Sequence, residues 1–178
     1  PGVNERSISE LGQLREWFGA CTWEVTAETR SGYPERGAPP SGCYTLYLVG
    51  PSNLAMHWGE PYVYYDNQIW RCIDGYEELY TRLAGLWEEK TARNFPEWFR
   101  SGYPDREELA QAVESLSWAP GQPAPEGAEG VTVRSGSGSV SVTFYPGNLV
   151  YYYQDRYWNY WFQGIGDAAL YSLAAEPS

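Results

Sequence analysis

The sequence predicts an α+β fold in which mainly antiparallel strands form one large twisted sheet or two small ones, with about three helices packed on them. Segments in which apolar and polar residues alternate, as in half-buried strands, occur in both halves of the chain. Segments with apolar residues three or four positions apart, as in amphipathic helices, separate these strands. The chain has 178 residues, 43% of them hydrophobic, which is enough for a single domain with a real core.

The first quarter of the chain begins with a predicted helix at residues 8–19, for which Ser7 and Glu10 form a capping box. The alternating segment 21–29 predicts a strand, and the Gly- and Pro-rich segment 31–42 predicts a loop. Four further strands are expected in the segments CYTLYLVG, NLAMHWG, PYVYY and QIWRCI, which lie between residues 43 and 73.

Two helices are predicted in the middle of the chain. Asp74, with Glu77 three positions later, is expected to cap the first of them. Its apolar stripe consists of Tyr76, Tyr80, Leu83 and Trp87. The segment NFPEWF, residues 94–99, is expected to end this helix because proline lacks the N–H that a helix needs. Asp105 and Glu108 repeat the capping pattern for the next helix.

The last third of the chain is predicted to be mostly strands. The Pro- and Gly-rich segment 119–130 indicates a linker or a long loop. Strands are expected in VTVR, SVSVTFY, LVYYYQ and RYWNYWF, and a flexible SGSGS segment joins the first two. The segment DAALYSLAA is expected to form a short helix capped by Asp167.

Two nearly identical segments, RSGYPER at 30–36 and RSGYPDR at 100–106, suggest an internal repeat. The triplet VYY also occurs twice, at 63–65 and at 150–152. One hypothesis is a duplication that divides the chain into similar halves, 1–99 and 100–178. The other is a turn that is used twice, since Gly-Tyr-Pro favours a turn wherever it occurs. The sequence leaves both hypotheses open.

The net charge and the amino-acid composition limit the kinds of molecule that this protein is expected to bind. The formal net charge of −11 disfavours nucleic acid and anionic membranes, and it leaves a basic protein as a suitable partner. The chain also holds 9 Trp, 16 Tyr and 5 Phe. So many tyrosine hydroxyls are difficult to satisfy in a core, and Trp and Tyr are the residues that anchor binding surfaces. The composition therefore favours a binding protein.

Catalytic and metal-binding patterns are scarce in the sequence. His57 is the only histidine and is expected to be structural, which leaves no multi-histidine metal site and disfavours a catalytic triad. Cys21, Cys43 and Cys72 are widely spaced and are expected to be reduced thiols without a metal. Glu60 and Asp66 are the only acidic residues in aromatic surroundings, which gives little support for a hydrolase. We expect no enzyme activity, no cofactor and a soluble cytoplasmic protein.

In size, acidity and α+β character the chain resembles the immunity proteins of bacterial polymorphic toxin systems. It resembles more loosely the antitoxin of the tuberculosis necrotizing toxin, an NAD-hydrolysing enzyme. The segments that carry this resemblance are REWFGACTWEV, YVYYDNQIWRC, YYYQDRYWNYWF and RSGSGS. The resemblance implies a non-catalytic protein that binds and blocks a cognate toxin, whose active-site cleft we expect to be basic. It assigns no functional residue.

The binding surface is predicted on the Ser- and Gly-rich loop and the aromatic strands near it, because a narrow loop beside large rings can enter a cleft. It comprises Arg134, Ser135, Gly136, Ser137, Gly138, Ser139, Tyr151, Tyr153, Trp158 and Tyr160. The alternative is a carbohydrate-binding or other aromatic-rich interaction module, in which Tyr152, Gln154, Asp155 and Trp158 contact the sugar.

Overall fold

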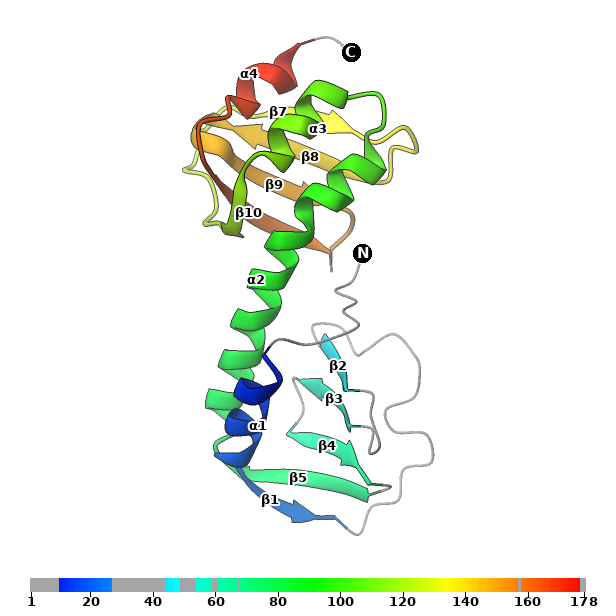
Figure 1. Cartoon of the computed structure of the whole chain (residues 1–178), viewed down its shortest axis with the longest axis vertical. Coiled ribbons are helices and arrows are strands. Elements are labelled where there is room, and N and C mark those ends of the chain that lie inside the picture. The colour runs from blue at the N-terminus through cyan, green and yellow to red at the C-terminus, as the bar shows by residue number, and fades with distance from the viewer. Residues whose placement is uncertain are drawn as a thin grey trace. The chain divides into compact units, whose positions relative to one another are not determined.

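The computed structural model describes residues 10–26, 44–48, 54–58, 61–66, 68–156 and 158–176, and for 44–48 and 54–58 it describes the backbone alone. It confirms the α+β fold, with antiparallel sheets and helices (Figure 1). The chain divides into two compact units, one containing Glu5–Gly85 and the other Leu86–Ser178. The boundary falls within a helix, whereas the hypothesis of two halves placed it between residues 99 and 100.

The N-terminal unit contains a helix and a five-stranded antiparallel sheet with the order β1-β5-β4-β3-β2. Its elements are α1 (Leu11–Gly19), β1 (Thr22–Val25), β2 (Tyr44–Leu48), β3 (Leu54–Trp58), β4 (Tyr62–Tyr65) and β5 (Gln68–Asp74). Val63 and Cys72 are buried on the sheet, as are Leu14 of α1 and Leu79 and Leu83 of the helix that follows β5. This unit therefore has an apolar core of its own.

The C-terminal unit contains a second five-stranded antiparallel sheet, with the order β6-β10-β9-β8-β7. The helix α2 (Tyr76–Gly102) begins in the first unit and ends in the second. The elements that follow are α3 (Glu107–Glu114), β6 (Ser117–Pro120), β7 (Val131–Arg134), β8 (Ser141–Tyr145), the 3₁₀ turn η1 (Pro146–Asn148), β9 (Leu149–Tyr153), β10 (Asn159–Ile165) and α4 (Leu170–Ala175).

The two sheets have the same topology. In each unit the last four strands form a meander, and the first strand pairs with the last one at the edge. The two VYY triplets lie in equivalent strands, β4 and β9, and the valine of each triplet is buried: Val63 is 4% exposed and Val150 is 0% exposed. The shared topology supports a repeated unit whose boundary lies at Gly85–Leu86.

The RSGYP segments are not equivalent positions of this repeat. The second copy, 100–106, ends α2 and leads into α3. The first copy, 30–36, lies between β1 and β2 in the chain and outside the described residues. The repeated sheet topology and the repeated RSGYP sequence are therefore separate observations. The second copy of RSGYP is a turn that ends a helix.

The helix α2 continues through the segment that was expected to end it. Pro96 lies inside α2, where it cannot donate a backbone hydrogen bond. Phe95 and Phe99, on either side of this proline, are both 0% exposed. Burial of these two rings holds the helix against the sheet, and this packing outweighs the lost hydrogen bond. The predicted helix end was wrong for this reason.

Two of the predicted helix caps are also different in the structure. Arg106, not Asp105, precedes α3, and no side chain caps that helix. Ala169 precedes α4, and the expected cap from Asp167 is absent. The side chain of Asn148 takes its place, because its Oδ1 accepts the Leu170 N–H at 3.3 Å and its Nδ2 donates to the Gly166 carbonyl at 3.3 Å.

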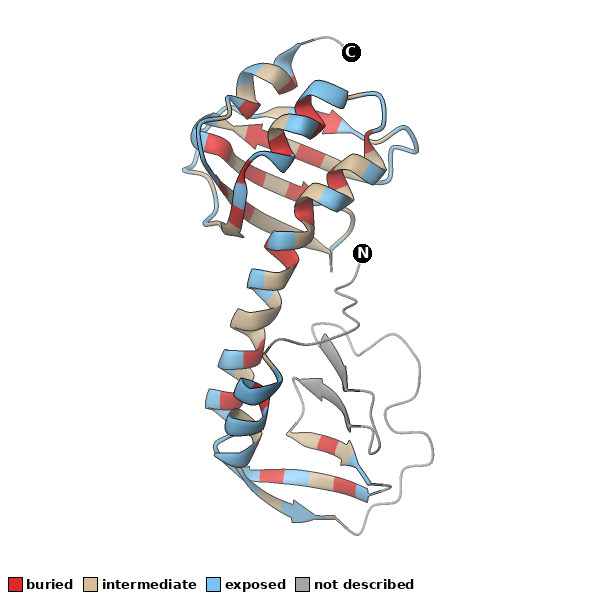
Figure 2. Cartoon of the chain, viewed as in Figure 1, coloured by how far each residue is buried: buried red, intermediate tan, exposed pale blue. Residues whose placement is uncertain are grey.

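The C-terminal core lies between one face of the second sheet and the helices α2, α3 and α4. Alternation along β8 and β9 turns every second residue to this inner face, as the burial pattern in Figure 2 shows. The Phe95 ring lies 4.6 Å from Trp118 and 5.1 Å from Phe162, and the Phe99 ring lies 5.6 Å from Phe144. These rings fix α2 on the inner face and leave the other face without a helix among the described elements.

Arg100 connects α2 to α3 through two carboxylates. It forms an ion pair with Glu114 and another with Glu107 at 3.2 Å. Hydrogen bonds from Gln111 and Arg100 lower the pKa of Glu107, and the hydrogen bond from Arg100 lowers the pKa of Glu114. A carboxylate whose pKa is lower in the folded state stabilises the fold above its unfolded pKa, and this stabilisation is lost as the pH falls through the folded pKa.

We therefore predict that Arg100→Gln lowers the melting temperature modestly at pH 7, because all these side chains are exposed to solvent. The difference from the wild type should shrink as the pH falls from about 5 to about 2. Thermal denaturation followed by circular dichroism across this range measures both effects. Arg93→Gln is the matched control, since Arg93 pairs only within α2, with Glu89 at 3.6 Å. A pH-independent difference for Arg100→Gln would contradict the prediction.

Candidate binding surface

The outer face of the C-terminal sheet carries a group of aromatic side chains. Strand alternation and pairing bring Tyr145 of β8, Tyr151 and Tyr153 of β9 and Trp161 of β10 to this face. The Trp161 ring lies 4.7 Å from Tyr151 and 5.5 Å from Tyr145, and Tyr151 lies 6.2 Å from Tyr153. We call these four residues the outer aromatic cluster. Its rings pack on one another, so the cluster presents a compact surface.

The loop between β7 and β8, residues 135–139, is a narrow hairpin tip with its own hydrogen bonds. The hydroxyl of Ser137 lies 3.1 Å from that of Ser135 and 2.7 Å from that of Ser139. The Gly138 N–H donates to the Ser135 carbonyl at 2.8 Å, and Gly138 has a φ of 70°, which glycine adopts without strain. No atom beyond the neighbouring residues lies near the position of a Cβ at Gly136 or Gly138, so the tip projects into open space.

The hairpin tip and the outer aromatic cluster adjoin each other. Pairing aligns Arg134 with Ser141, Ser141 with Tyr153, and Tyr153 with Asn159 in one row across the outer face. Arg134 is the residue directly before the tip, and Tyr153 is 41% exposed. The tip therefore continues the sheet at the end where Tyr153 lies.

The structure divides the predicted binding residues into two groups. Arg134, the tip residues Ser135–Ser139, Tyr151 and Tyr153 lie together. Tyr160 points to the inner face, where its ring stacks on Phe162 at 5.8 Å. Trp158 packs against Trp87 at 6.3 Å and Tyr160 at 6.4 Å. These two residues belong to the packing of the unit and not to the surface that contains Tyr151.

Tyr145 and Trp161 were missed by the sequence analysis. Each is next to a residue of the opposite face, Phe144 or Phe162, and the segment WNYWF gives no sign of which aromatic residue points outward. The pairing of Trp161 with Tyr151 depends on the length of the β9–β10 connection. Continuing the alternation from the buried Phe144 would have placed Tyr145 on the outer face.

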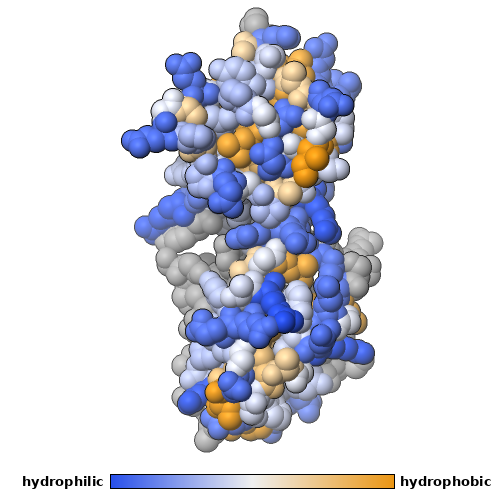
Figure 3. All heavy atoms as spheres, turned by 90° about the vertical axis from the view of Figure 1, so that its left-hand side faces the viewer, coloured by the Kyte–Doolittle hydropathy of each residue, from blue (hydrophilic) through white to orange (hydrophobic). Residues whose placement is uncertain are grey.

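The strand residues of the outer face are almost uncharged, although the chain is strongly acidic. Of the described strand residues that alternation turns to this face, only Arg134 is charged. Burial and the neighbouring phenols of Tyr153 and Tyr145 raise the pKa of Tyr151, so its hydroxyl remains a neutral donor. α2 contains five glutamates and four basic residues, whereas α3 contains three glutamates and no basic residue. On the side of the molecule drawn in Figure 3, strongly hydrophobic residues form small patches between hydrophilic ones.

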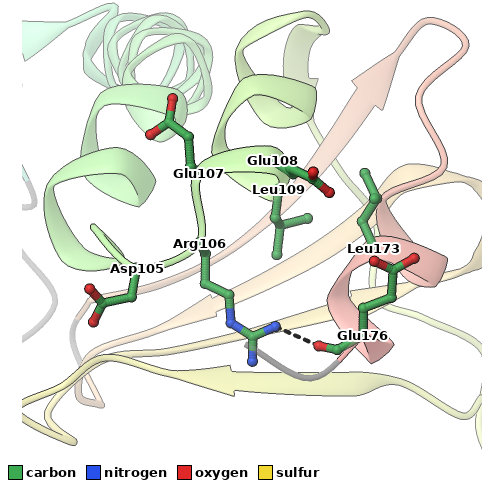
Figure 4. A pocket seen from close by; sticks show the side chains of 7 residues that line it. All are labelled: Asp105, Arg106, Glu107, Glu108, Leu109, Leu173 and Glu176. Atoms are coloured by element: carbon green, nitrogen blue, oxygen red, sulfur yellow. Dashed lines mark hydrogen bonds between the residues drawn. The ribbon is translucent and has the colours of Figure 1, made fainter.

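A pocket of about 240 Å³ lies between α3 and α4. It is lined by Asp105, Arg106, Glu107, Glu108, Leu109, Leu173 and Glu176. Arg106 donates to the Glu176 carbonyl at 2.7 Å, and the side chains of Asp105, Glu107 and Glu108 point in different directions (Figure 4). The described part of the chain holds no group of three or more His, Cys, Asp or Glu that could bind a metal ion.

The remaining candidates for chemistry are His57, Glu60, Asp66 and the three cysteines. His57 lies in β3, opposite Thr45, and its side chain is outside the described structure, as are Glu60 and Cys43. Asp66 occupies the turn between β4 and β5 with a φ of 51°. Cys21 and Cys72 are free thiols. No helix within the described ranges is long and apolar enough to span a membrane.

Comparison with known proteins finds no matching family model, curated protein or solved structure. The function is therefore inferred from the geometry of the outer face and the hairpin tip.

Burial and the neighbouring Cys72 raise the pKa of the Cys21 thiol to about 11. We predict that Cys21 reacts slowly with iodoacetamide at pH 7.5, because the thiolate is the nucleophile and its fraction at this pH is on the order of 0.1% or less. Its labelling should accelerate as the pH rises toward about 10. Peptide mass spectrometry measures the rate at this residue, with the urea-unfolded chain as control. Labelling of folded Cys21 at the rate of the unfolded chain at pH 7.5 would contradict the prediction.

Proposed function

We propose that this protein is a non-catalytic immunity protein that binds a cognate toxin enzyme and blocks it. The observation that carries this proposal is the hairpin tip beside the outer aromatic cluster. Residues 135–139 project into open space, and Arg134, Tyr153 and Tyr151 lie at the base of the tip. A narrow tip of this kind fits a cleft, while Tyr and Trp beside it supply large contact area at low entropic cost.

Charge contributes to this function at a distance. The net charge of −11 attracts a toxin with a basic cleft and increases the rate of encounter. The outer face itself is nearly neutral, so contact with the partner depends on aromatic packing and hydrogen bonds. In this proposal the net negative charge of the chain steers the toxin, and the outer aromatic cluster and the tip hold it.

A carbohydrate ligand receives less support. Sugars stack on the open faces of aromatic rings, and Trp161 is in contact with two tyrosine rings, at 4.7 Å and 5.5 Å. These contacts cover part of its faces. Trp158, a central residue of the carbohydrate hypothesis, packs against Trp87 and Tyr160.

The proposal predicts that a neighbouring gene encodes a toxin domain, and that domain is the probe that tests it. Co-expression of the chain should restore growth to bacteria that produce the toxin domain, and the two purified proteins should form a complex. Failure of both would refute the proposal. Binding to an oligosaccharide array, with no effect on the toxin, would favour the alternative module.

Within that complex we predict that Trp161→Ala weakens binding by about tenfold or more, equivalent to about 1.4 kcal/mol, because it removes the centre of the outer aromatic cluster. Trp158→Ala should lower the melting temperature and change affinity less, since Trp158 packs within the unit. Biolayer interferometry and thermal denaturation measure the two quantities. Equal loss of affinity in both variants would show that the outer aromatic cluster is not the contact surface.

We also predict that the association rate falls as salt rises from about 50 to about 500 mM, because screening removes the steering effect of the net negative charge. The dissociation rate should change less, since the contact surface is nearly neutral. Kinetic measurements over this range separate the two rates. A dissociation rate that rises more steeply than the association rate falls would contradict the division between steering and contact.

A further inference from the structure

Tyr103 is a buried tyrosine that comes directly after α2, in the second RSGYP segment. It is 4% exposed, and its ring stacks on Phe99 at 4.6 Å with an interplanar angle of 16°. The ring therefore belongs to the core. The Tyr103 hydroxyl takes no part in this ring stacking.

The hydroxyl of Tyr103 reaches both arms of the β7–β8 hairpin. It lies 3.3 Å from the Val133 carbonyl and 3.1 Å from the Val140 carbonyl. These residues stand on either side of Arg134 and the tip. The Val140 carbonyl also accepts a hydrogen bond from the Ser135 N–H at 2.9 Å, and this bond closes the tip. The Tyr103 hydroxyl therefore contacts the same acceptor as the bond that closes the tip.

The chemistry of this position suits a permanent donor. Burial, with a smaller contribution from nearby Tyr152, raises the pKa of Tyr103 well above its usual value. The hydroxyl keeps its proton, and a backbone carbonyl is a strong acceptor in the low-dielectric interior. Serine and glycine lose much conformational freedom when they are ordered, so a tip built from them needs an external anchor to hold one direction.

We propose that Tyr103 is a positioning residue whose hydroxyl fixes the hairpin tip in the conformation that enters the partner. This inference rests on the proposed function of the tip. A tip that is already ordered loses less entropy on binding, and this raises affinity without a new contact. Tyr103 does not touch the partner in this arrangement, because it is buried beneath the hairpin.

Tyr103→Phe tests the proposal because it keeps the stacked ring and removes only the hydroxyl. Amide hydrogen exchange of the full chain, resolved by NMR, should rise about fivefold at Ser135 and Gly138, the equivalent of about 1 kcal/mol for one hydrogen bond. These two amides close the tip. Amides of β9 and β10 should exchange at the wild-type rate.

Tyr152→Phe is the matched control. Tyr152 is also 4% exposed in the same core, and its hydroxyl donates to the side chain of Gln154 at 3.4 Å and not to a carbonyl of the hairpin. It should lower the melting temperature by a similar amount without a selective change at Ser135 and Gly138. Tip exchange that is unchanged in Tyr103→Phe, or that rises equally in both variants, would overturn the proposal.

The toxin domain then separates this inference from the proposed function. If Tyr103→Phe frees the tip and weakens toxin binding severalfold while Tyr152→Phe does not, both stand. If the tip is freed and toxin affinity is unchanged, the role of Tyr103 in binding is overturned and the contact lies elsewhere on the surface. If wild-type protein does not bind the toxin, the proposed function fails, and the exchange data still decide whether Tyr103 holds the tip.

Discussion

The packing of α2 on one face of the C-terminal sheet is the constraint on which the rest of that unit depends. Phe95 and Phe99 are fully buried there, and they keep the helix continuous through Pro96. Because side chains alternate along a strand, a covered face requires that the intervening residues point the other way. Covering one face with α2 therefore turns Tyr145, Tyr151 and Trp161 to the opposite face.

Long-range electrostatic attraction and short-range contact place different demands on the residues of this acidic chain. Charged residues on helices act over the range of the Debye length, about 8 Å at physiological salt, and they do not need a fixed geometry. Rings and hydroxyls act only in contact and need a rigid support. The sheet supplies that support for the outer aromatic cluster, and the hydrogen bonds among Ser135, Ser137 and Ser139 supply it for the tip. A nearly uncharged strand surface and a strong net negative charge are therefore both compatible with the proposed binding function.

Local patterns in the sequence predicted the class of fold and most of the strands, because alternation and helical spacing are local properties. Predictions from these local patterns failed where tertiary packing determines the structure. The end of α2 could not be predicted because burial of Phe95 and Phe99 outweighs the effect of Pro96. The prediction of the binding residues failed for a similar reason. Tyr160 and Trp161 are adjacent in the sequence, and the register of β10 against β9 determines which of them points outward. This register depends on a distant strand and not on the local sequence. The tip was recognisable, since Ser and Gly between two strands indicate a turn without any knowledge of packing.

The side chain of Asn148 has a consequence for the order in which the chain folds. α4 has six residues, too few to be stable alone in water, and its first amide is bound by a side chain that precedes it by 22 positions. Asn148 itself adopts a φ of 60° at the turn between β8 and β9, so its side chain is in place only when that turn has formed. α4 therefore depends on the β8–β9 turn for its first hydrogen bond, and a ribosome must release the chain through residue 175 before this unit can close.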